Sequence, residues 1–364
     1  MPKGRKAFGS AGLRIFRVIP LRLPPATVSY RLSLLDKSPI PEGATAQNAL
    51  LRTIAIAQRA EQLGYHRYWL AEHHGSALLA GSAPEVLVAH LLAKTSRIRI
   101  GTGGVMLQHY SPYKVAEVFK VLASLAPGRV DLGVGKAPGG LPNSTRALQS
   151  LHDASSKPAF AEQLAELDAF LDGDLPDDHR LAGAVAGPTP PQLPHRVLLG
   201  GSPESAELAA RRGWHFVYAG HFNGDPLNIE RSLSAYRAVS NGRAPLLAVF
   251  AFAAPTQREA ERLVDGLRSF KVHLRTGQSV NLPSLAAAAE FARQAGLIQP
   301  GDYRTEEQHP QVIAGTAEHV KAELDALSER HGIQEFVIDN PVAGFAERLA
   351  SVELLAEAHQ PAWA

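Results

Sequence analysis

The sequence predicts an α/β protein, a (β/α)8 TIM barrel with an insertion near residues 275–311. Strand-like and helix-like segments alternate from residue 28 onwards with short connections, which is typical of a parallel sheet. Eight strand-like segments fit the repeat of such a barrel. A doubly wound open sheet is the competing fold, but it would carry a glycine-rich phosphate loop after its first strand, and residues 34–39 do not form one.

The individual elements follow from apolar periodicity and from the positions of glycine and proline. Strands are expected at residues 28–34, 66–71, 98–106, 130–134, 196–199, 214–219, 246–253 and 335–338. Helices are expected at 46–63, 84–96, 112–125, 160–171, 204–212, 227–240, 257–274, 318–331 and 346–358. Residues 275–311 have no clear place in this repeat, and we interpret them as an insertion with one short helix at 285–295.

The composition excludes several classes of protein. Among 364 residues, 45% are hydrophobic and 20% charged, which excludes a disordered, collagen-like or coiled-coil chain. The chain has no cysteine, which excludes disulfides, zinc-thiolate sites, iron–sulfur clusters and a cysteine nucleophile. A reducing, cytoplasmic compartment is therefore expected. No apolar run approaches the ~18 residues of a membrane span, so no membrane partner is expected.

The charge distribution separates a short leader from the rest of the chain. The first 22 residues carry six basic side chains and no acidic one. Without these six, 31 basic side chains face 35 acidic ones, so a nucleic-acid partner is not indicated. We expect residues 1–27 to be a basic, disordered extension, with a targeting segment as the alternative, and residues 28–364 to form a single barrel domain.

Functional groups of a (β/α)8 barrel lie at the carboxyl ends of its strands. The second predicted strand ends in Glu72, His73 and His74. Because adjacent strand residues point to opposite faces, one histidine is expected to point into the barrel mouth and the other to pack locally. His73 is the preferred candidate for proton transfer near neutral pH. The same geometry argues against a metal site formed by the three residues.

Glycine-rich segments follow the next two predicted strands. Gly103 and Gly104 suggest unusual backbone angles or the close approach of a ligand to the backbone. Lys136 lies among the glycines that follow the fourth strand. Flexible backbone around one cation suits an anionic group such as a phosphate, although a solvated loop lysine would look the same in the sequence.

The fifth predicted strand ends directly before a helix, at Gly200, Gly201, Ser202 and Ser205. Free N–H groups at a helix start bind anions, and serine hydroxyls add donors; an ordinary serine N-cap is the alternative. Because this segment and Lys136 follow neighbouring strands, the two are predicted to share one phosphate.

These segments together resemble the bacterial luciferase-like flavin-dependent monooxygenases, over about residues 28–358. Residues 72–74, 101–104, 133–136 and 201–205 carry the resemblance. Family members have a non-proline cis peptide beneath the flavin in the second segment, so the Gly103-Gly104 peptide is expected to be cis. Lys136 stands where arginine is usual and loses bidentate phosphate geometry. Gly135 replaces the reactive cysteine of light-emitting members, which argues against a true luciferase.

The resemblance implies an FMN-dependent monooxygenase that uses reduced FMN, usually from a separate flavin reductase, and oxygen on a small organic substrate. FMN would be bound by Gly103, Gly104, Lys136, Gly200, Gly201, Ser202 and Ser205, with His73, His74 and Glu72 as the catalytic residues. A homodimer is expected, and the insertion is the expected lid. By position, an apolar mouth is predicted from Leu107, Tyr110, Phe216 and Phe222.

Three alternatives stay open. Related family members transfer hydride with a deazaflavin instead of FMN. Others sequester flavin without catalysis, but such a protein has little need of titratable residues at positions 72–74. A sugar-phosphate barrel enzyme would use the same phosphate site. A purified protein that is colourless and shows no tightening with added FMN would favour this alternative.

Overall fold

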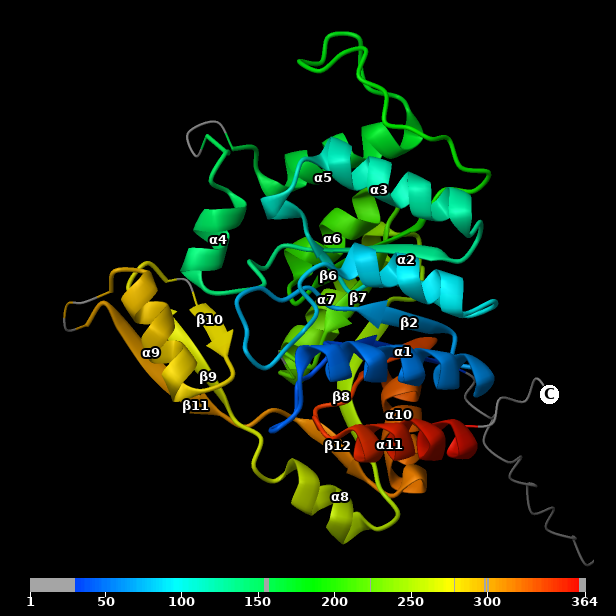
Figure 1. Ribbon diagram of the computed structural model, residues 1–364, viewed down its shortest axis with the longest axis vertical. Helices are drawn as coiled ribbons and strands as arrows, with labels where there is room; N and C mark the ends of the chain where they lie inside the picture. Colours follow the sequence, from blue (N-terminus) through cyan, green and yellow to red (C-terminus); the bar gives the residue numbers. More distant parts are fainter. Residues whose placement is uncertain are drawn as a thin grey trace, which may run out of the picture.

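The computed structural model describes residues 30–153, 157–222, 224–277, 279–297, 299 and 301–359, so the predicted extension at residues 1–27 lies outside the described residues. Eight parallel strands form a closed barrel surrounded by helices (Figure 1). β13 pairs with both β8 and β1 and thereby closes the sheet. The barrel strands are β1 (Arg31–Asp36), β2 (Arg67–Leu70), β3 (Arg99–Thr102), β5 (Val130–Gly135), β6 (His195–Gly200), β7 (His215–Ala219), β8 (Leu246–Ala253) and β13 (Glu335–Asp339). The predicted TIM barrel is confirmed.

The helices pack their apolar faces on the outside of the barrel. Proline occupies the first turn of α2, α3, α6 and α7, where its missing N–H costs nothing. Among the described residues, none of the helices is both long enough and apolar enough to cross a membrane. The surrounding helices are α1 (Ala46–Gln62), α2 (Pro84–Lys94), α3 (Pro112–Leu125), α5 (Phe160–Asp172), α6 (Pro203–Arg211), α7 (Pro226–Val239), α10 (Ala317–His331) and α11 (Phe345–Ala358).

Two segments near the site differ from the predicted elements. The strand expected at 98–106 is interrupted at Gly103, and its second part is the short β4 (Val105–Met106), which pairs with β5. A single 3-10 turn, η1 (Leu107–His109), follows it. The loop after β5 contains α4 (Pro142–Leu148), a helix that was not predicted.

The predicted helix at 257–274 is wrong in its second half. α8 (Gln257–Val264) ends early, and β9 (Ser269–Leu274) follows. Phe270 and Val272 alternate with polar residues, a period of two that buries both against Ala288. β9 is the middle strand of an antiparallel sheet with β10 (Ser279–Leu282) and β11 (Tyr303–Gln308), and α9 (Leu285–Gln294) packs on it. The insertion thus begins at β9, lies beside α4 (Figure 1) and ends before β12 (Val312–Gly315), which extends the pairing of β8.

Alternation along the strands divides the barrel interior into layers. The middle layer is apolar and buried, and comprises Leu35, Trp69, Ala71, Val197, Val217, Leu246, Ala248 and Val337. Two residues earlier along β1, β2, β6, β7 and β13, the same side carries Ser33, Arg67, His195, His215 and Glu335. The end of the barrel where the strands begin is therefore polar.

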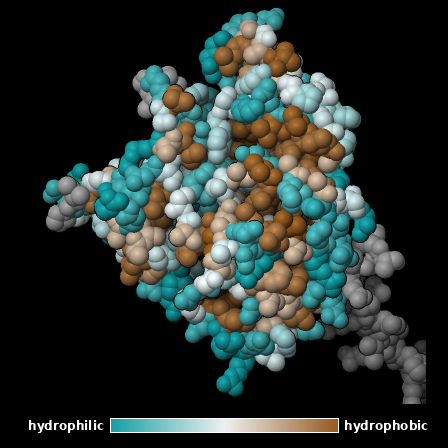
Figure 2. All heavy atoms as spheres, in the orientation of Figure 1, coloured by the Kyte–Doolittle hydropathy of each residue, from teal (hydrophilic) through white to brown (hydrophobic). Residues whose placement is uncertain are grey.

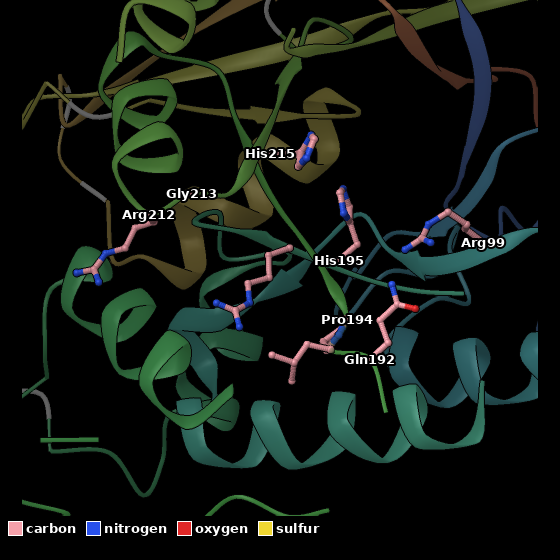
Figure 3. Close-up of a pocket in the computed structure, with 9 residues that line it drawn as sticks. Arg99, Gln192, Pro194, His195, Arg212, Gly213 and His215 are labelled. Carbon is pink, nitrogen blue, oxygen red and sulfur yellow. The ribbon is translucent and has the colours of Figure 1, made fainter. Parts of the chain in front are cut away.

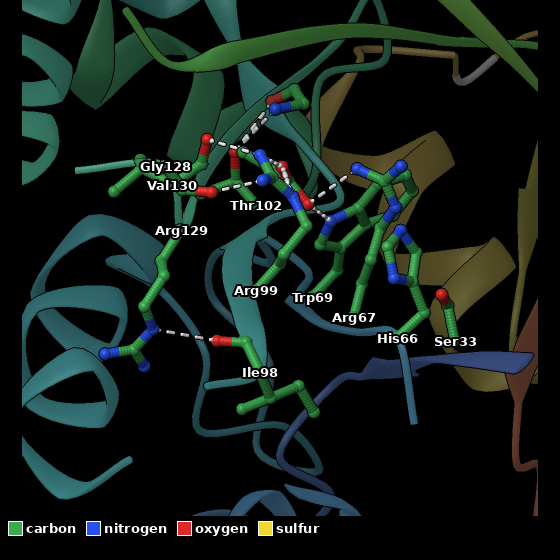
Figure 4. Close-up of polar contacts among 12 residues, drawn as sticks. Ser33, His66, Arg67, Trp69, Ile98, Arg99, Thr102, Gly128, Arg129 and Val130 are labelled. Carbon is green, nitrogen blue, oxygen red and sulfur yellow. Dashed lines mark hydrogen bonds and ion pairs between the residues drawn. The ribbon is translucent and has the colours of Figure 1, made fainter. Parts of the chain in front are cut away.

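A network of paired charges fills this end of the barrel. Arg67 lies 2.7 Å from Glu335 and 3.0 Å from Asp131, both through its guanidinium. Arg99 and the indole N–H of Trp69 also donate to the Asp131 carboxylate. Figure 4 shows Arg67, Trp69 and Arg99 close together, with their side chains turned toward a common point. Burial alone would raise the pKa of Asp131, but Arg67 and Arg99 hold it below its usual value. The network is thus charged and internally balanced.

Candidate functional site

The opposite end of the barrel, where the strands end, carries the candidate site. Continuing the alternation two residues beyond the apolar layer places Lys37, His73, Phe250 and Asp339 on the inward side. Lys37 and His73 follow the ends of β1 and β2, and Phe250 and Asp339 lie near the ends of β8 and β13. The four side chains therefore come from four different strands. Barrel enzymes build their active sites from such positions.

The imidazole of His73 has an unpartnered nitrogen among the described residues. Its Nδ1 atom is buried and has no hydrogen bond to any of them, while its backbone N–H donates to the carbonyl of Gly81 at 2.8 Å. Burial, with the nearby Lys37 charge, lowers the pKa of His73 to about 4. The ring is therefore neutral at pH 7 and is suited to accept a proton or a hydrogen bond rather than to act as a strong acid.

A second group at the mouth was missed by the sequence analysis. The Lys37 ammonium lies 2.5 Å from the buried carboxylate of Asp339 and lies over the rings of Phe250 and Phe222, 4.9 and 5.6 Å from their centroids. His221 Nε2 lies 3.9 Å from the same carboxylate. Lys37 and Asp339 could have been found by extending the inward positions of β1 and β13 by two residues. Nothing in the sequence pairs them, because they lie at opposite ends of the chain.

Glu72 and His74 lie on the other side of the strand end from His73. Glu72 is fully buried, and its carboxylate accepts hydrogen bonds from His74 Nε2 at 2.7 Å, from the Tyr110 hydroxyl at 2.8 Å and from the Met106 N–H at 3.0 Å. Of the predicted catalytic residues, only His73 lies on the inward side. The other two connect β2 to β4 and η1, and their catalytic role stays a prediction.

The loop that carries Lys136 is held by η1. His109 Nε2 donates to the Pro138 carbonyl at 2.8 Å, and Gln108 donates to the Lys136 carbonyl at 2.7 Å. His109 Nδ1 accepts from the Gln149 amide at 2.8 Å. These partners fix the neutral form of the ring, in agreement with a pKa that burial lowers. The Lys136 side chain is exposed and, within the described part of the chain, has no hydrogen bond or ion pair.

The predicted phosphate residues follow adjacent strands. Gly135 pairs with Leu199, so Lys136 and Gly200 stand next to each other at the ends of β5 and β6. Ser202 is the N-cap of α6, and its hydroxyl accepts from the Ser205 N–H at a long 3.4 Å. A Cβ at Gly200 would lie 2.5 Å from Ser205 Cβ, whereas Gly201 faces open space. An ammonium, a hydroxyl and free helix N–H groups suit a phosphate.

The Gly103-Gly104 peptide bond is cis, as predicted. Packing requires glycine at position 104, because a Cβ there would lie 2.7 Å from the backbone carbonyl of Gly133, whereas a Cβ at Gly103 would lie 2.7 Å from a terminal methyl group of the Leu35 side chain. The predicted apolar mouth is wrong for Leu107 and Phe216, which are fully buried in the core between barrel and helices. Tyr110 bonds to Glu72, and Phe222 is half exposed beside Lys37.

A cavity of about 400 Å³ lies at the other end of the barrel. Figure 3 shows His195 and His215 side by side in it, with Arg99 to one side. Of its three arginines, Arg99 is paired with Asp131, and Arg196 with Asp168 and Asp172, so two of the three are neutralised. No cluster of metal-ligating side chains occurs in the parts of the chain that the structure describes. None of the predicted site residues lines this cavity.

A closed parallel barrel with convergent polar groups at its carboxyl end is the architecture of an α/β-barrel enzyme. The family model of the luciferase-like monooxygenases matches residues 31–349. An N-acetyl-S-alkylcysteine monooxygenase of Bacillus subtilis (strain 168) is 45% identical over 333 residues, which is 90% of this chain and 98% of the relative. The chain belongs to the luciferase-like monooxygenase family.

Solved structures agree with this assignment. The crystal structure of apo-MsnO8 superposes with a TM-score of 0.72 at 32% identity and covers 92% of this chain and 98% of its own. The oxygenating constituent of 3,6-diketocamphane monooxygenase of Pseudomonas putida, in complex with FMN, shares the fold with a TM-score of 0.67 at 18% identity, covering 91% of this chain and 98% of its own. An F420-dependent secondary alcohol dehydrogenase shares it at 17% identity with a TM-score of 0.62, again over 91% and 98%. Flavin use is thus implied by the family, with FMN and F420 both represented among its fold neighbours.

Proposed function

We propose that this protein is an FMN-dependent monooxygenase of the two-component type, which receives reduced FMN from a separate reductase. The observation that carries the proposal is Lys136, whose side chain is exposed and which follows β5, the strand next to the one that leads to Ser202 at the start of α6. A cation, a hydroxyl and a helix N-terminus together favour a phosphate group. FMN has such a phosphate and riboflavin lacks it, which makes the assignment testable.

We propose an S-substituted, N-acylated cysteine as the substrate class, by extension from the 45% identical relative. Bound reduced flavin would supply two electrons to oxygen, so that one oxygen atom enters the substrate and the other leaves as water. His73 is the residue proposed to accept a proton or hydrogen bond at the reacting centre, because its buried Nδ1 is unpartnered. A protein that only sequesters flavin would have no use for this nitrogen.

The insertion is proposed as a lid over the mouth. The Asn143 N–H donates to the Gln294 side chain at 2.8 Å, which joins α4 to α9. On the other side, the Asn281 amide donates to the Phe222 carbonyl at 3.4 Å. The insertion therefore contacts both the loop that follows β5 and the loop that follows β7, and it can limit the access of water to a site between them.

A homodimer is proposed as the assembly. Figure 2 shows apolar residues gathered where α3 lies in Figure 1, and Val121 and Leu125 of this helix are 44% and 74% exposed. Apolar surface of this kind is typical of protein interfaces. Light scattering on the purified protein would give the mass, and a monomer at micromolar concentration that persists on flavin binding would contradict this part of the proposal.

The decisive experiment compares FMN with riboflavin. Anaerobic titration of reduced FMN is expected to give tight binding, and Lys136→Ala is expected to weaken it by about 1.5–3 kcal/mol, the value of a hydrogen bond to a charged group. Riboflavin should bind the parent and the variant alike. Equal FMN affinity in both proteins would refute the phosphate assignment. Binding of F420 in preference to FMN would indicate a deazaflavin-dependent hydride-transfer enzyme.

A further inference from the structure

Lys37 and His221 at the mouth have unused hydrogen-bonding capacity, and they point to a ligand site apart from the proposed phosphate site. We infer that Lys37, supported by His221, binds the carboxylate group of the substrate. This inference deepens the proposed function, because it names the charged group by which the substrate would be recognised.

Lys37 is fixed by its surroundings and yet remains accessible. Its side chain is 21% exposed, whereas that of its partner Asp339 is 2% exposed, so the carboxylate lies on the protein side of the ammonium. An ammonium has three N–H donors, and in the described part of the chain Asp339 is its one ionic or hydrogen-bonding partner. The rings of Phe250 and Phe222 hold it by cation–π contact. Donor capacity is therefore left for a ligand.

His221 stands beside this ammonium with an unpartnered nitrogen. Its side chain is 2% exposed, and among the described residues its Nδ1 has no hydrogen bond. Burial and the Lys37 charge lower the pKa of His221, so its ring is neutral and carries one N–H. A buried polar nitrogen without a partner is costly, and a ligand oxygen would satisfy it.

A carboxylate can share Lys37 with Asp339. The same barrel already contains a cation that serves two carboxylates, since Arg67 bridges Asp131 and Glu335. At the mouth the corresponding arrangement would be one protein carboxylate and one ligand carboxylate, with the imidazole N–H of His221 as an additional donor. A neutral amide in the same place would accept a hydrogen bond from the ammonium but would lack the attraction between two opposite charges, so the site discriminates between the two groups.

Barrel geometry separates this site from the phosphate site. The strand order places β1 and β13 next to each other, and β6 four positions from β1, on the opposite side of the barrel. Lys37 and Asp339 follow or end β1 and β13, whereas Lys136 and Ser202 follow β5 and β6. One mouth thus presents two cationic positions on opposite sides. A flavin phosphate at one leaves the other for a different anion.

The test measures how the protein discriminates between a carboxylate and its neutral isostere. N-acetyl-S-benzylcysteine and its carboxamide are titrated calorimetrically into the protein, with and without saturating oxidised FMN. The parent protein is expected to prefer the carboxylate about 10- to 100-fold, the range of one charge-assisted hydrogen bond.

The informative variant replaces the ion pair by a neutral pair. Lys37→Met alone would leave Asp339 buried and unpaired and would risk misfolding, so it is combined with Asp339→Asn. This double variant is expected to bind both probes within about twofold of each other, with an unchanged circular dichroism melting curve. The control variant, Lys136→Met, removes the other cation of the mouth. It should weaken FMN binding, while the protein still prefers the carboxylate probe to the carboxamide.

Several outcomes would overturn the inference: equal affinity of the parent for the two probes, binding of neither probe, or a preference that survives in the double variant. If the carboxylate preference is present and depends on Lys37 but FMN does not bind, the proposed function fails and the carboxylate site stands. The two conclusions can therefore be separated in one set of titrations.

Discussion

The buried carboxylate of Glu72 accepts the backbone N–H of Met106 at 3.0 Å, which joins the end of β2 to the short strand that follows the Gly103-Gly104 peptide. Because His74 and Tyr110 donate to the other oxygen of this carboxylate, Glu72 holds three segments in place at once. Each of its two oxygens accepts at least one hydrogen bond, so Glu72 connects these segments as a hydrogen-bond acceptor.

We predict that Glu72→Gln destabilises the protein by about 1–3 kcal/mol, the cost of an unsatisfied buried group, because the new NH2 must face the N–H of Met106 or the donors on the other side. Urea unfolding measures the change. Glu117→Gln is the matched control, since Glu117 forms an ion pair with Lys114 on the surface of α3, and it should change stability by less than about 0.5 kcal/mol. Equal stabilities for the two variants would contradict the role assigned to Glu72.

His73 and His74 are predicted to have separable roles. His73→Ala should lower oxygenation about 10²–10⁴-fold, as loss of a general base does, and leave FMN affinity nearly unchanged. With a pKa of about 4, His73 is neutral above pH 5, so the parent's rate should not fall between pH 8 and pH 5 through titration of this residue. His74→Ala should instead lower the melting temperature. Loss of turnover in His74→Ala with retention in His73→Ala would reverse the assignment.

Binding of the FMN phosphate is predicted to depend on His109, although this residue lies away from the proposed phosphate contacts. His109→Leu removes the hydrogen bond to Pro138 and loosens the loop that carries Lys136. We expect FMN affinity to fall by about 1 kcal/mol, roughly fivefold, with riboflavin affinity unchanged. His90→Leu on the exposed side of α2 is the control. A parallel loss of FMN and riboflavin affinity would point to general unfolding rather than to the loop.

Stability is predicted to decrease below pH 6.5. Burial and the Arg67 charge lower the pKa of both His66 and His195 to about 3. A histidine with a depressed folded-state pKa stabilises the folded protein above its unfolded pKa near 6.5, and this contribution is lost as the pH falls towards 3. Urea unfolding at several pH values measures the slope.

The variant His195→Leu should reduce that slope by up to about 1.4 kcal/mol per pH unit between pH 6 and pH 4, since it removes one titrating group. His152→Gln, an exposed position, should leave the slope as it is. A slope that is the same in all three proteins would mean that His195 ionises freely in the folded state.

Much of the barrel was predictable because its signals are local. Alternation in β2, with Trp69 and Ala71 on the inside, is enough to place His73 inside and His74 outside. The segment around Phe270 and Val272 was not predictable as β9, because a short amphipathic stretch fits a helix and a strand equally well until its partners β10 and β11 are known. Lys37 and Asp339 were missed for a related reason, since their pairing exists only once β1 and β13 close the barrel.

The charged network around Arg67 has a consequence for how ligands enter and leave the molecule. Because Arg67, Asp131 and Glu335 are buried at one end and the apolar layer above them is packed with side chains, the barrel interior is open to ligands at its other end only. Everything that reaches the inward side of the strand ends must come and go over a single rim. Two ligands held on opposite sides of this mouth therefore share one route of entry and exit, so that either one, when bound, narrows the path of the other.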